Sequence, residues 1–410
     1  MTATIVARSA PPASQSAAGA IAVHADQRIP SLDGLRAVAS LMVVAYHFGP
    51  HIVRTQSPFQ FLHSLPQLMF AGVDLFFVLS GFLIAGILLD ARESQNYFKV
   101  FYVRRAFRIF PLYYLVLLAY VVTVAVLGAR TAQLGRLFEN PISPWAYAFY
   151  LQNFAMTAAS GFGPVWLAGS WSLAVEEQFY ATLPLVIRKL NTRVLTRVVV
   201  ATFLGAPILR AVIQKFQFIH PLGGHLLLPT CVDSLAAGVL VAMLVRQHYS
   251  WLSRKQRQIK WAALACLAAW IAYQYIPNPQ SIRLAFILDT GNSIVFAGVL
   301  LVILMNPGMW LSRALAIRPM RELGGMAYST YLFHPILLCF AFRVMTSHDP
   351  QLNSFSDFPA LTAALLATLA LSFVSWRFFE KPILAIGHRF TYQRQAAAWS
   401  DPVASAIGTL

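Results

Sequence analysis

Long runs of apolar residues recur along this chain, separated by short polar stretches. A helix needs about 20 mostly apolar residues to cross a bilayer. The pattern predicts ten such helices, near 34–53, 68–89, 109–128, 171–188, 198–214, 230–246, 260–276, 284–305, 326–346 and 359–379. The stretch 142–158 is aromatic but short and flanked by proline, which favours an interfacial or re-entrant segment, with an eleventh span as the alternative.

Composition supports the same interpretation. Of the 410 residues, 58% are hydrophobic and 11% are charged, whereas a soluble domain carries about 25% charged residues. No soluble fold could bury that much apolar surface. We therefore predict an all-α fold, a polytopic helical bundle whose solvent is the lipid bilayer.

The net charge of +16 suggests nucleic-acid binding at first, but the cations lie between apolar runs and form no aromatic-rich basic patch. Lys and Arg concentrate on the cytoplasmic side of membrane proteins. If the N-terminus is cytoplasmic, most cations fall on the inner side, and both termini lie there. The predicted outer loops keep only Arg54, Arg130, Arg136, Lys215 and Arg283.

The chain divides into one membrane domain with two tails. We predict a disordered cytoplasmic tail over 1–28, which lacks the apolar core of a signal peptide, a membrane domain over 29–382 and a cytoplasmic tail over 383–410. The three cysteines, Cys231, Cys266 and Cys339, are far apart and without metal-type spacing. They are expected to be packing residues, and no metal site is predicted.

Ionisable groups inside spans are costly and therefore functional candidates. Arg36 and His47 lie eleven residues apart on the first span, on one helix face and about 16 Å apart along its axis. With the predicted orientation, Arg36 lies near the inner surface and His47 in the outer half. They cannot touch, and Asp33 is the expected ion-pair partner of Arg36.

Further polar residues are expected at a depth similar to that of His47. They are Asp74, Trp171, Ser172, Glu176, Glu177, Asp233, Asp289 and His334, with Ser80 deeper. Together they predict an outward-facing polar cavity, with a basic inner mouth at Arg36 and 104–108. The remaining histidines, His24, His51, His63, His220, His225, His248, His348 and His388, fall in predicted loops or tails and receive no role.

Each of these residues also has a structural interpretation. A histidine in a span is more often a packing group than a base, and Trp171 alone is typical of an interface anchor. Arg105 and Arg108 suit a topology signal on spacing alone. Histidine is nevertheless the usual general base near neutral pH, and a carboxylate beside it would fix its tautomer.

Nucleotide-binding, zinc-protease and nucleophile-elbow motifs are missing from the sequence. This leaves acyl or group transfer by a base, and proton-coupled transport, as the chemistry that the polar residues could serve.

Five motifs identify a family. The sequence resembles the membrane acyltransferase-3 family at LDGLR (32–36) with YH (46–47), FFVLSGF (76–82), RRAFRIFP (104–111), WSLAVEEQFY (171–180) and YLFHP (331–335). These matches run in order from about residue 31 to 382, and WSLAVEEQFY is the most distinctive of them. Proline directly follows His334 here, which departs from the family's usual spacing.

The resemblance implies an O-acyltransferase of a bacterial inner membrane. Such enzymes move an acyl group, most often acetyl, from cytoplasmic acyl-CoA to a hydroxyl of an envelope or exported glycan, such as O-antigen or exopolysaccharide. Acyl-CoA would be a co-substrate, with no bound cofactor. Many relatives carry a C-terminal SGNH hydrolase-like domain, which is not expected in the 28 residues after the predicted membrane domain.

Roles carried over by the resemblance are as follows. His47 is the base, Arg36, Arg105 and Arg108 bind the donor, and Glu176 and Glu177 help to build the outer site. Asp74, Ser80, Trp171, Ser172 and His334 remain acceptor-site candidates, and Ser80 could instead carry a transient acyl group.

The rival function is a proton-coupled transporter or a flippase of a lipid-linked glycan. Buried Glu and His residues suit both classes, but transporters often contain inverted repeats. No counterpart of WSLAVEEQFY occurs in the second half of the sequence.

Overall fold

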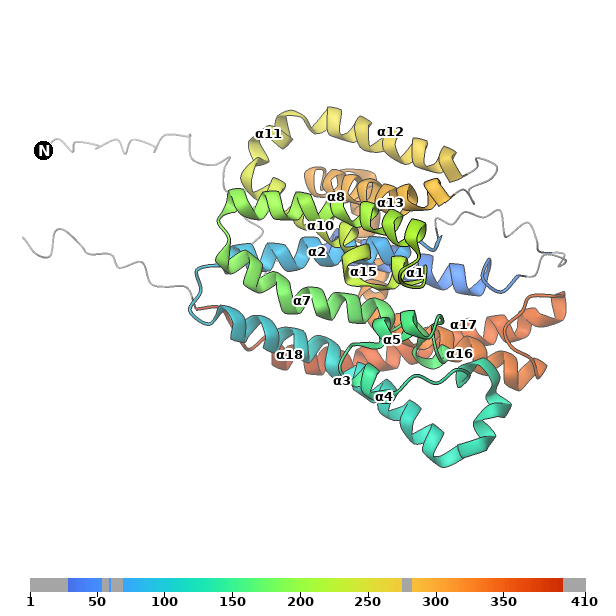
Figure 1. Cartoon of the computed structure of the whole chain (residues 1–410). Coiled ribbons are helices and arrows are strands. Elements are labelled where there is room, and N and C mark those ends of the chain that lie inside the picture. The colour runs from blue at the N-terminus through green and yellow to red at the C-terminus, as the bar shows by residue number, and fades with distance from the viewer. Residues whose placement is uncertain (1–28, 54–58, 60–68, 275–281, 394–410) are drawn as a thin grey trace, which may run out of the picture.

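The helices lie side by side with nearly parallel axes in the computed structural model of this chain (Figure 1). The connections 91–96 and 190–191 gather at one end of the bundle, and 128–170 and 347–354 gather at the other. We call these the inner end and the outer end, after the predicted orientation. The structure describes residues 29–53, 59, 69–274 and 282–393. The predicted tail 1–28 and most of the predicted tail 383–410 lie outside these ranges.

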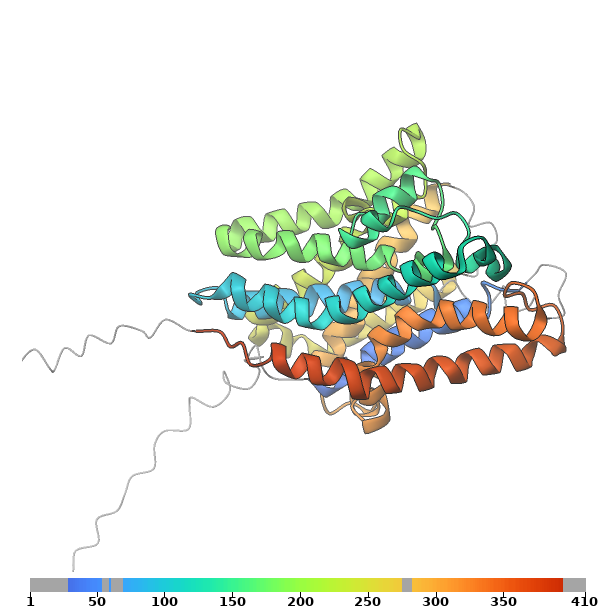
Figure 2. The same cartoon turned by 90° about the horizontal axis from the view of Figure 1, so that it is seen from below.

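Ten long helices make up the described bundle. They are α1 (Pro30–Phe48), α2 (Gly72–Asp90), α3 (Tyr97–Leu127), α7 (Trp171–Lys189), α8 (Thr192–Phe216), α10 (Leu228–Gln247), α12 (Gln256–Gln274), α13 (Ile282–Met305), α16 (Ala327–Thr346) and α17 (Phe358–Val374). A π-helical turn, η5 (Ser375–Glu380), and α18 (Lys381–Gly387) continue α17. Figure 2 shows this red arm along one edge of the bundle and the yellow-green α8 along the opposite edge.

Short helices connect the long ones. They are η3 (Gly128–Leu137), α4 (Pro144–Ala148), α5 (Gln152–Ala158), α6 (Val165–Ala168), α9 (Gly223–Leu226), α11 (Tyr249–Arg254), α14 (Trp310–Leu315), α15 (Arg318–Gly325) and η4 (Phe355–Asp357). In the described part of the chain, β pairing is limited to one isolated bridge between Val53 and Leu352.

Each predicted span overlaps one long helix, which confirms the all-α membrane class. Six stretches of the described residues are long and apolar enough by themselves to cross a membrane: Gly72–Asp90, Tyr97–Leu137, Thr192–Phe216, Gly223–Gln247, Ala327–Thr346 and Phe355–Gly387. Ten crossings and two cytoplasmic termini stay predictions.

The largest boundary error concerns α3, which begins at Tyr97 rather than near residue 109. Arg104, Arg105 and Arg108 therefore lie on a helix and not in a loop. Arginine is a good helix former, and its long apolar stem packs along a helix surface while the charge points elsewhere. A hydropathy threshold excludes such residues from a span even though the helix continues through them.

Glycine allows α2 and α10 to pack backbone against backbone at the centre of the bundle. A Cβ on Gly81 would collide with the carbonyl of Leu235, and a Cβ on Gly238 would collide with the carbonyl of Val78. Small residues are enriched at membrane helix contacts because they permit this close approach. The two glycines thus fix the distance between two helices that support the site.

The connection 128–170 folds over the outer end of the bundle. It contains η3, α4, α5 and α6, and the predicted interfacial segment 142–158 corresponds to α4 and α5, so an eleventh span is wrong. Two amide side chains attach it to α7. Gln152 donates to the carbonyl of Ser170, the N-cap of α7 (2.8 Å), and Gln178 of α7 donates to the Tyr150 carbonyl (3.0 Å). This connection is therefore a fixed part of the wall described below.

Candidate active site

Two histidines from different helices meet at the outer end. His47 lies in the last turn of α1, and His334 lies within α16 and is 1% exposed. His47 Nδ1 is 3.3 Å from His334 Nε2, and the ring centroids are 4.9 Å apart. The predicted base thus has an imidazole beside it, where the sequence led us to expect a carboxylate.

Hydrogen bonds to the backbone indicate the tautomer of both rings. His47 Nδ1 lies 2.8 Å from the Val43 carbonyl, and His334 Nδ1 lies 3.0 Å from the Thr330 carbonyl. A carbonyl oxygen accepts only, so each Nδ1 carries the proton and donates it. His334 Nε2 then offers a lone pair to the His47 Nδ1 proton, and His47 Nε2 keeps a lone pair of its own. That free lone pair is what a general base requires.

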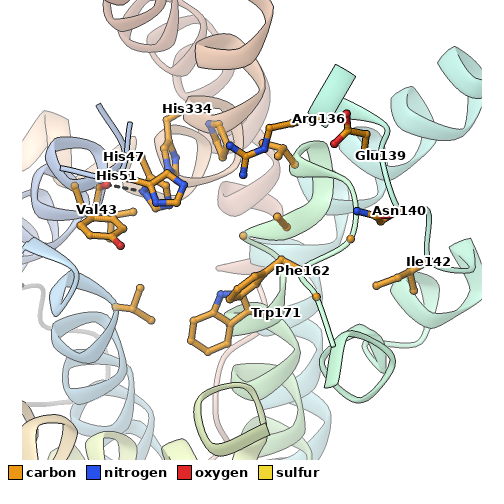
Figure 3. A pocket seen from close by; sticks show the side chains of 18 of the residues that line it. Val43, His47, His51, Arg136, Glu139, Asn140, Ile142, Phe162, Trp171 and His334 are labelled. Atoms are coloured by element: carbon orange, nitrogen blue, oxygen red, sulfur yellow. Dashed lines mark hydrogen bonds between the residues drawn. The ribbon is translucent and has the colours of Figure 1, made fainter. Parts of the chain in front are cut away.

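An outer cavity of about 650 Å³ contains both histidines (Figure 3). Helices α1, α2, α7 and α16 form one part of its wall, and the connection 128–170 forms the rest together with His51 and Phe70, which lie between α1 and α2. The aromatic lining residues are Tyr46, Phe70, Phe162, Trp171 and Tyr331. The polar lining residues besides the two histidines include His51, Arg136, Glu139, Asn140 and Ser160. Flat apolar faces beside polar groups suit a ligand such as a sugar ring.

His51 is a site residue that the sequence interpretation missed. Its ring centroid lies 5.3 Å from that of His47, and it lines the outer cavity. Enclosure by the protein, together with the positive charge of Arg136, lowers the pKa of His51 below its ordinary value. The four-residue spacing from His47, one helical turn beyond the end of α1, was the available signal.

The predicted donor-binding arginines line a middle cavity of about 110 Å³. Arg36, Arg105 and Arg108 face it together with Glu176 and Ser80. The Ser80 hydroxyl makes a hydrogen bond with the Tyr180 hydroxyl. Tyr180 also lines this cavity, and the Glu176 carboxyl lies beside both hydroxyl groups.

An inner cavity of about 300 Å³ lies beside the middle one. Arg104 joins the three arginines there, and the aromatic rings of Trp376 and Tyr392 complete the wall. Asp33 pairs with Arg36 at 3.2 Å, which confirms the ion pair expected from their spacing.

The three cavities adjoin one another along α1. Val73 and Tyr331 line both the outer and the middle cavity. Arg36, Leu83, Arg105 and Arg108 line both the middle and the inner cavity. The cavities thus form a row from the arginines to the paired histidines.

The prediction that one outer cavity holds all of these polar residues is wrong. Of the residues expected beside His47, the outer cavity contains His334 and Trp171, whereas Ser172, Ser80 and Glu176 line the middle cavity. Glu177 lines none of the three cavities. Successive residues on a helix differ by about 100° in direction, so an equal depth does not place two side chains in one cavity.

The three aspartates predicted for that cavity belong to a separate buried network. Asp74 accepts hydrogen bonds from Ser234 (2.9 Å) and Asn292 (2.7 Å). Asp233 pairs with Arg210 at 2.7 Å, and Asp289 lies 3.2 Å from His225. This network ties α2, α8, α10 and α13 together behind the cavities. His225, which received no role, is its most exposed member. Among the described residues, no group of three or more His, Cys, Asp or Glu side chains is arranged so that it could hold a metal ion.

Comparison with known proteins identifies the family of this chain. A family model described as an acyltransferase domain matches residues 29–377. YrhL of Bacillus subtilis is 28% identical over 382 residues, which are 88% of this chain and 56% of that protein. The peptidoglycan O-acetyltransferase OatA of Listeria monocytogenes is 28% identical over 380 residues, which are 87% of this chain and 56% of that protein.

The chain thus spans a little over half the length of these curated relatives. No solved structure matches it. The family match covers most of the chain and includes the paired histidines and the four arginines of the inner and middle cavities. The chain therefore belongs to the acyltransferase-3 family of acyltransferase domains.

Proposed function

We propose that this protein is a membrane O-acyltransferase that moves an acyl group, most simply acetyl, from acyl-CoA to a hydroxyl of an envelope glycan. One observation carries the proposal: the row of cavities joins a cluster of arginines to a pair of histidines. Family membership supports the reaction class, and similarity to the O-acetyltransferase OatA supports O-acetylation. A bacterial inner membrane is the proposed location.

The inner end suits the donor. Guanidinium groups bind phosphates through a fixed fork of N–H donors, and Arg36, Arg104, Arg105 and Arg108 line the inner cavity. The pantetheine arm of acyl-CoA would extend from there through the middle cavity. It has to cover the rise of eleven helical residues between Arg36 and His47, about 16 Å, to bring its thioester to the outer cavity.

The outer end suits the acceptor hydroxyl. His47 Nε2 would remove the hydroxyl proton while the hydroxyl oxygen forms a bond to the thioester carbonyl carbon. The carbon–sulfur bond then breaks, and the leaving thiolate takes the proton from His47. The products are an ester and a free thiol, with no net change in protons. His334 Nε2 would stabilise the imidazolium through the proton on His47 Nδ1.

Two acidic residues have a different place in this proposal from the one expected. Glu176 lies beside the arginines and not beside His47, so we propose that it orders the donor site and takes no part in the proton transfer. Glu177 interacts with the charge of Arg105 and would support that site from behind.

The test is acyl transfer by purified protein in liposomes, with labelled acetyl-CoA and glycan fragments that include peptidoglycan as one acceptor. Changing His47→Gln should lower turnover by about 10²–10⁴-fold, the usual contribution of a general base. His248→Gln provides the matched control, because His248 is exposed in a connection and lines none of the three cavities.

Two outcomes would overturn the proposal. Normal turnover by His47→Gln would remove this histidine from the mechanism. Movement of an unmodified lipid-linked glycan across the liposome membrane, with no label transferred from acetyl-CoA, would establish the transporter or flippase instead.

A further inference from the structure

The chain turns back across the inner end of the bundle after α18 ends at Gly387. We call residues 388–393 the strap. Figure 2 shows this last red segment running from α18 toward the beginning of α3. The family model matches residues 29–377, so the strap lies beyond the matched residues, and it contains none of the five family motifs.

Three hydrogen bonds attach the strap to the beginning of α3. Asn96, the N-cap of α3, donates from its side-chain Nδ2 to the Thr391 carbonyl at 3.0 Å. The Oδ1 of the same side chain accepts from the backbone N–H of Gln393 at 2.9 Å. The backbone N–H of Gln95 donates to the Gln393 carbonyl at 3.2 Å. These bonds hold the residues on both sides of Tyr392, so they determine where Tyr392 lies.

Arg104 makes two further contacts with the strap. Its Nε donates to the Phe390 carbonyl at 2.7 Å, and its guanidinium group lies 5.4 Å from the centroid of the Tyr392 ring. A guanidinium group over an aromatic ring is attracted by the negative face of the ring. The ring of Phe390 stacks on that of Phe107, with centroids 6.3 Å apart. The strap is thus joined to the helix that carries three of the four arginines of the inner cavity.

The inner cavity has an aromatic side as well as a cationic side. Tyr392 of the strap and Trp376 of η5 both line it, and both residues are half-buried. Trp376 is held in place, because its ring lies so close to Gly325 that a Cβ there would collide with it. Aromatic rings stack on nucleobases, and guanidinium groups bind phosphates. The combination fits a nucleotide, and a volume of about 300 Å³ is at the lower end of the range for small-molecule sites.

We propose that the strap builds the base-binding part of the donor site, in which Tyr392 and Trp376 lie against the adenine ring of acyl-CoA. This rests on the proposed function and adds to it the recognition of the base. The phosphates of the donor bind the arginines of the same cavity, and the pantetheine arm leaves toward the middle cavity. The adenosine moiety thereby anchors the donor at the inner end while the thioester extends toward the paired histidines.

The test compares two donors that share the reactive thioester and the pantetheine arm. Acetyl-CoA contains adenosine, and S-acetyl-phosphopantetheine does not. Changing Tyr392→Leu removes an aromatic ring and keeps an apolar side chain. We expect the KM for acetyl-CoA to rise about tenfold, in the range for the loss of one base–aromatic stack. The KM for S-acetyl-phosphopantetheine and kcat at saturating donor should stay unchanged.

Binding of ADP gives a measurement that does not depend on turnover. ADP carries the base and phosphates but no thioester, and calorimetry measures its binding directly. We expect ADP to bind the wild type and to bind Tyr392→Leu about tenfold more weakly. Trp376→Leu should show the same pattern with both donors and with ADP. It also serves as the test if Tyr392→Leu is not obtained folded.

Matched variants separate base binding from general damage. Phe378→Leu removes a ring of η5 that is 71% exposed and should change no constant. Asn96→Ala removes two hydrogen bonds to the strap, and Asn96 lines none of the three cavities. A smaller rise in the KM for acetyl-CoA is therefore expected. Asn191→Ala changes another N-cap at the inner end, that of α8, and should leave the KM for acetyl-CoA unchanged.

Three results would overturn the base-binding role and leave the proposed function intact. The first is equal ADP binding and an equal KM for acetyl-CoA in the wild type, Tyr392→Leu and Trp376→Leu. The second is an equal loss with both thioester donors, which shows general damage. The third is a wild type with the same KM for both donors, which shows that adenosine is not recognised. A wild-type protein that binds no CoA refutes the proposed function and the base-binding role together.

Discussion

His334 Nε2 lies 3.3 Å from His47 Nδ1, so the two rings are neighbours across α1 and α16. Each ring donates its Nδ1 proton to a carbonyl one turn earlier on its own helix. Two imidazoles in such contact can hold one extra proton comfortably, but a second would place like charges side by side. In the proposed mechanism, the pair would therefore accept and return one proton as a unit.

This arrangement predicts a graded response at His334. His334→Phe removes one of the two acceptors beside the His47 Nδ1 proton and leaves the Val43 carbonyl. We expect kcat to fall about tenfold, in line with one hydrogen bond to a charged group. His334→Gln keeps an acceptor oxygen, so its kcat should fall less. The KM for acyl-CoA should not change, because His334 lies at the far end of the row from the arginines. Steady-state kinetics in liposomes would check this, and a raised KM without a change in kcat would contradict it.

The charge of Arg136 should control the protonation of His51. Enclosure and Arg136 both lower the pKa of His51, so Arg136→Gln should raise it toward the ordinary value of about 6.5. An NMR titration of ring-labelled histidine in detergent measures this directly. Arg130→Gln, on the same helix η3, is the control and should leave the pKa of His51 unchanged. A pKa that is unchanged in both variants would exclude the electrostatic contact.

Glycine at the α2–α10 contact should be irreplaceable. Gly81→Ala and Gly238→Ala each push a methyl group into a carbonyl of the facing helix, and overpacking typically costs about 1–3 kcal/mol. Both should lower the thermal unfolding midpoint in detergent. Gly205→Ala, on α8 with open space where the Cβ would lie, should be neutral or slightly stabilising. Equal midpoints for all three variants would show that the helices can separate freely.

Breaking the buried ion pair of Arg210 and Asp233 should lower the free energy of unfolding more than breaking an exposed ion pair. Their side chains are 2% and 1% exposed. Arg210→Met leaves Asp233 buried without its partner, which costs about 3–5 kcal/mol. Adding Asp233→Asn to that variant should restore part of the lost free energy of unfolding, because the buried charge is then removed.

Arg318→Ala breaks the exposed pair with Glu322 and provides the control. It should cost about 1 kcal/mol or less. Unfolding in detergent measures all of these variants. An Arg210→Met protein as stable as Arg318→Ala would show that water reaches the network.

Much of the fold could be predicted from hydropathy, because lipid leaves a spanning chain few alternatives to the helix. Each predicted segment overlaps one long helix, and the short, proline-flanked stretch 142–158 folds as the short helices α4 and α5. The predicted helix boundaries were less accurate where arginine residues continue a helix, as at the start of α3. The π turn Ser375–Glu380 also escaped prediction, because its local sequence reads as part of a regular helix.

The site was predicted in part. The spacing of Arg36 and His47 placed them correctly at two ends of one helix face, and the cavities that join them confirm their separation. The prediction that the acidic residues share one cavity with His47 is wrong, because Asp74 lies in a separate network with Ser234 and Asn292. Which helices are neighbours decides such groupings, and a single sequence does not specify it. The pairing of His47 with His334 depends on the same information.

The connection 128–170 has a consequence for how this protein can change over generations. It contributes Arg136, Glu139, Asn140, Ser160 and Phe162 to the outer cavity, whereas the paired histidines come from α1 and α16. Insertions and substitutions in one surface stretch can therefore reshape the entrance while the reactive groups keep their places. On the proposed function, changes confined to residues 128–170 would alter which acceptor is bound and leave the paired histidines in place.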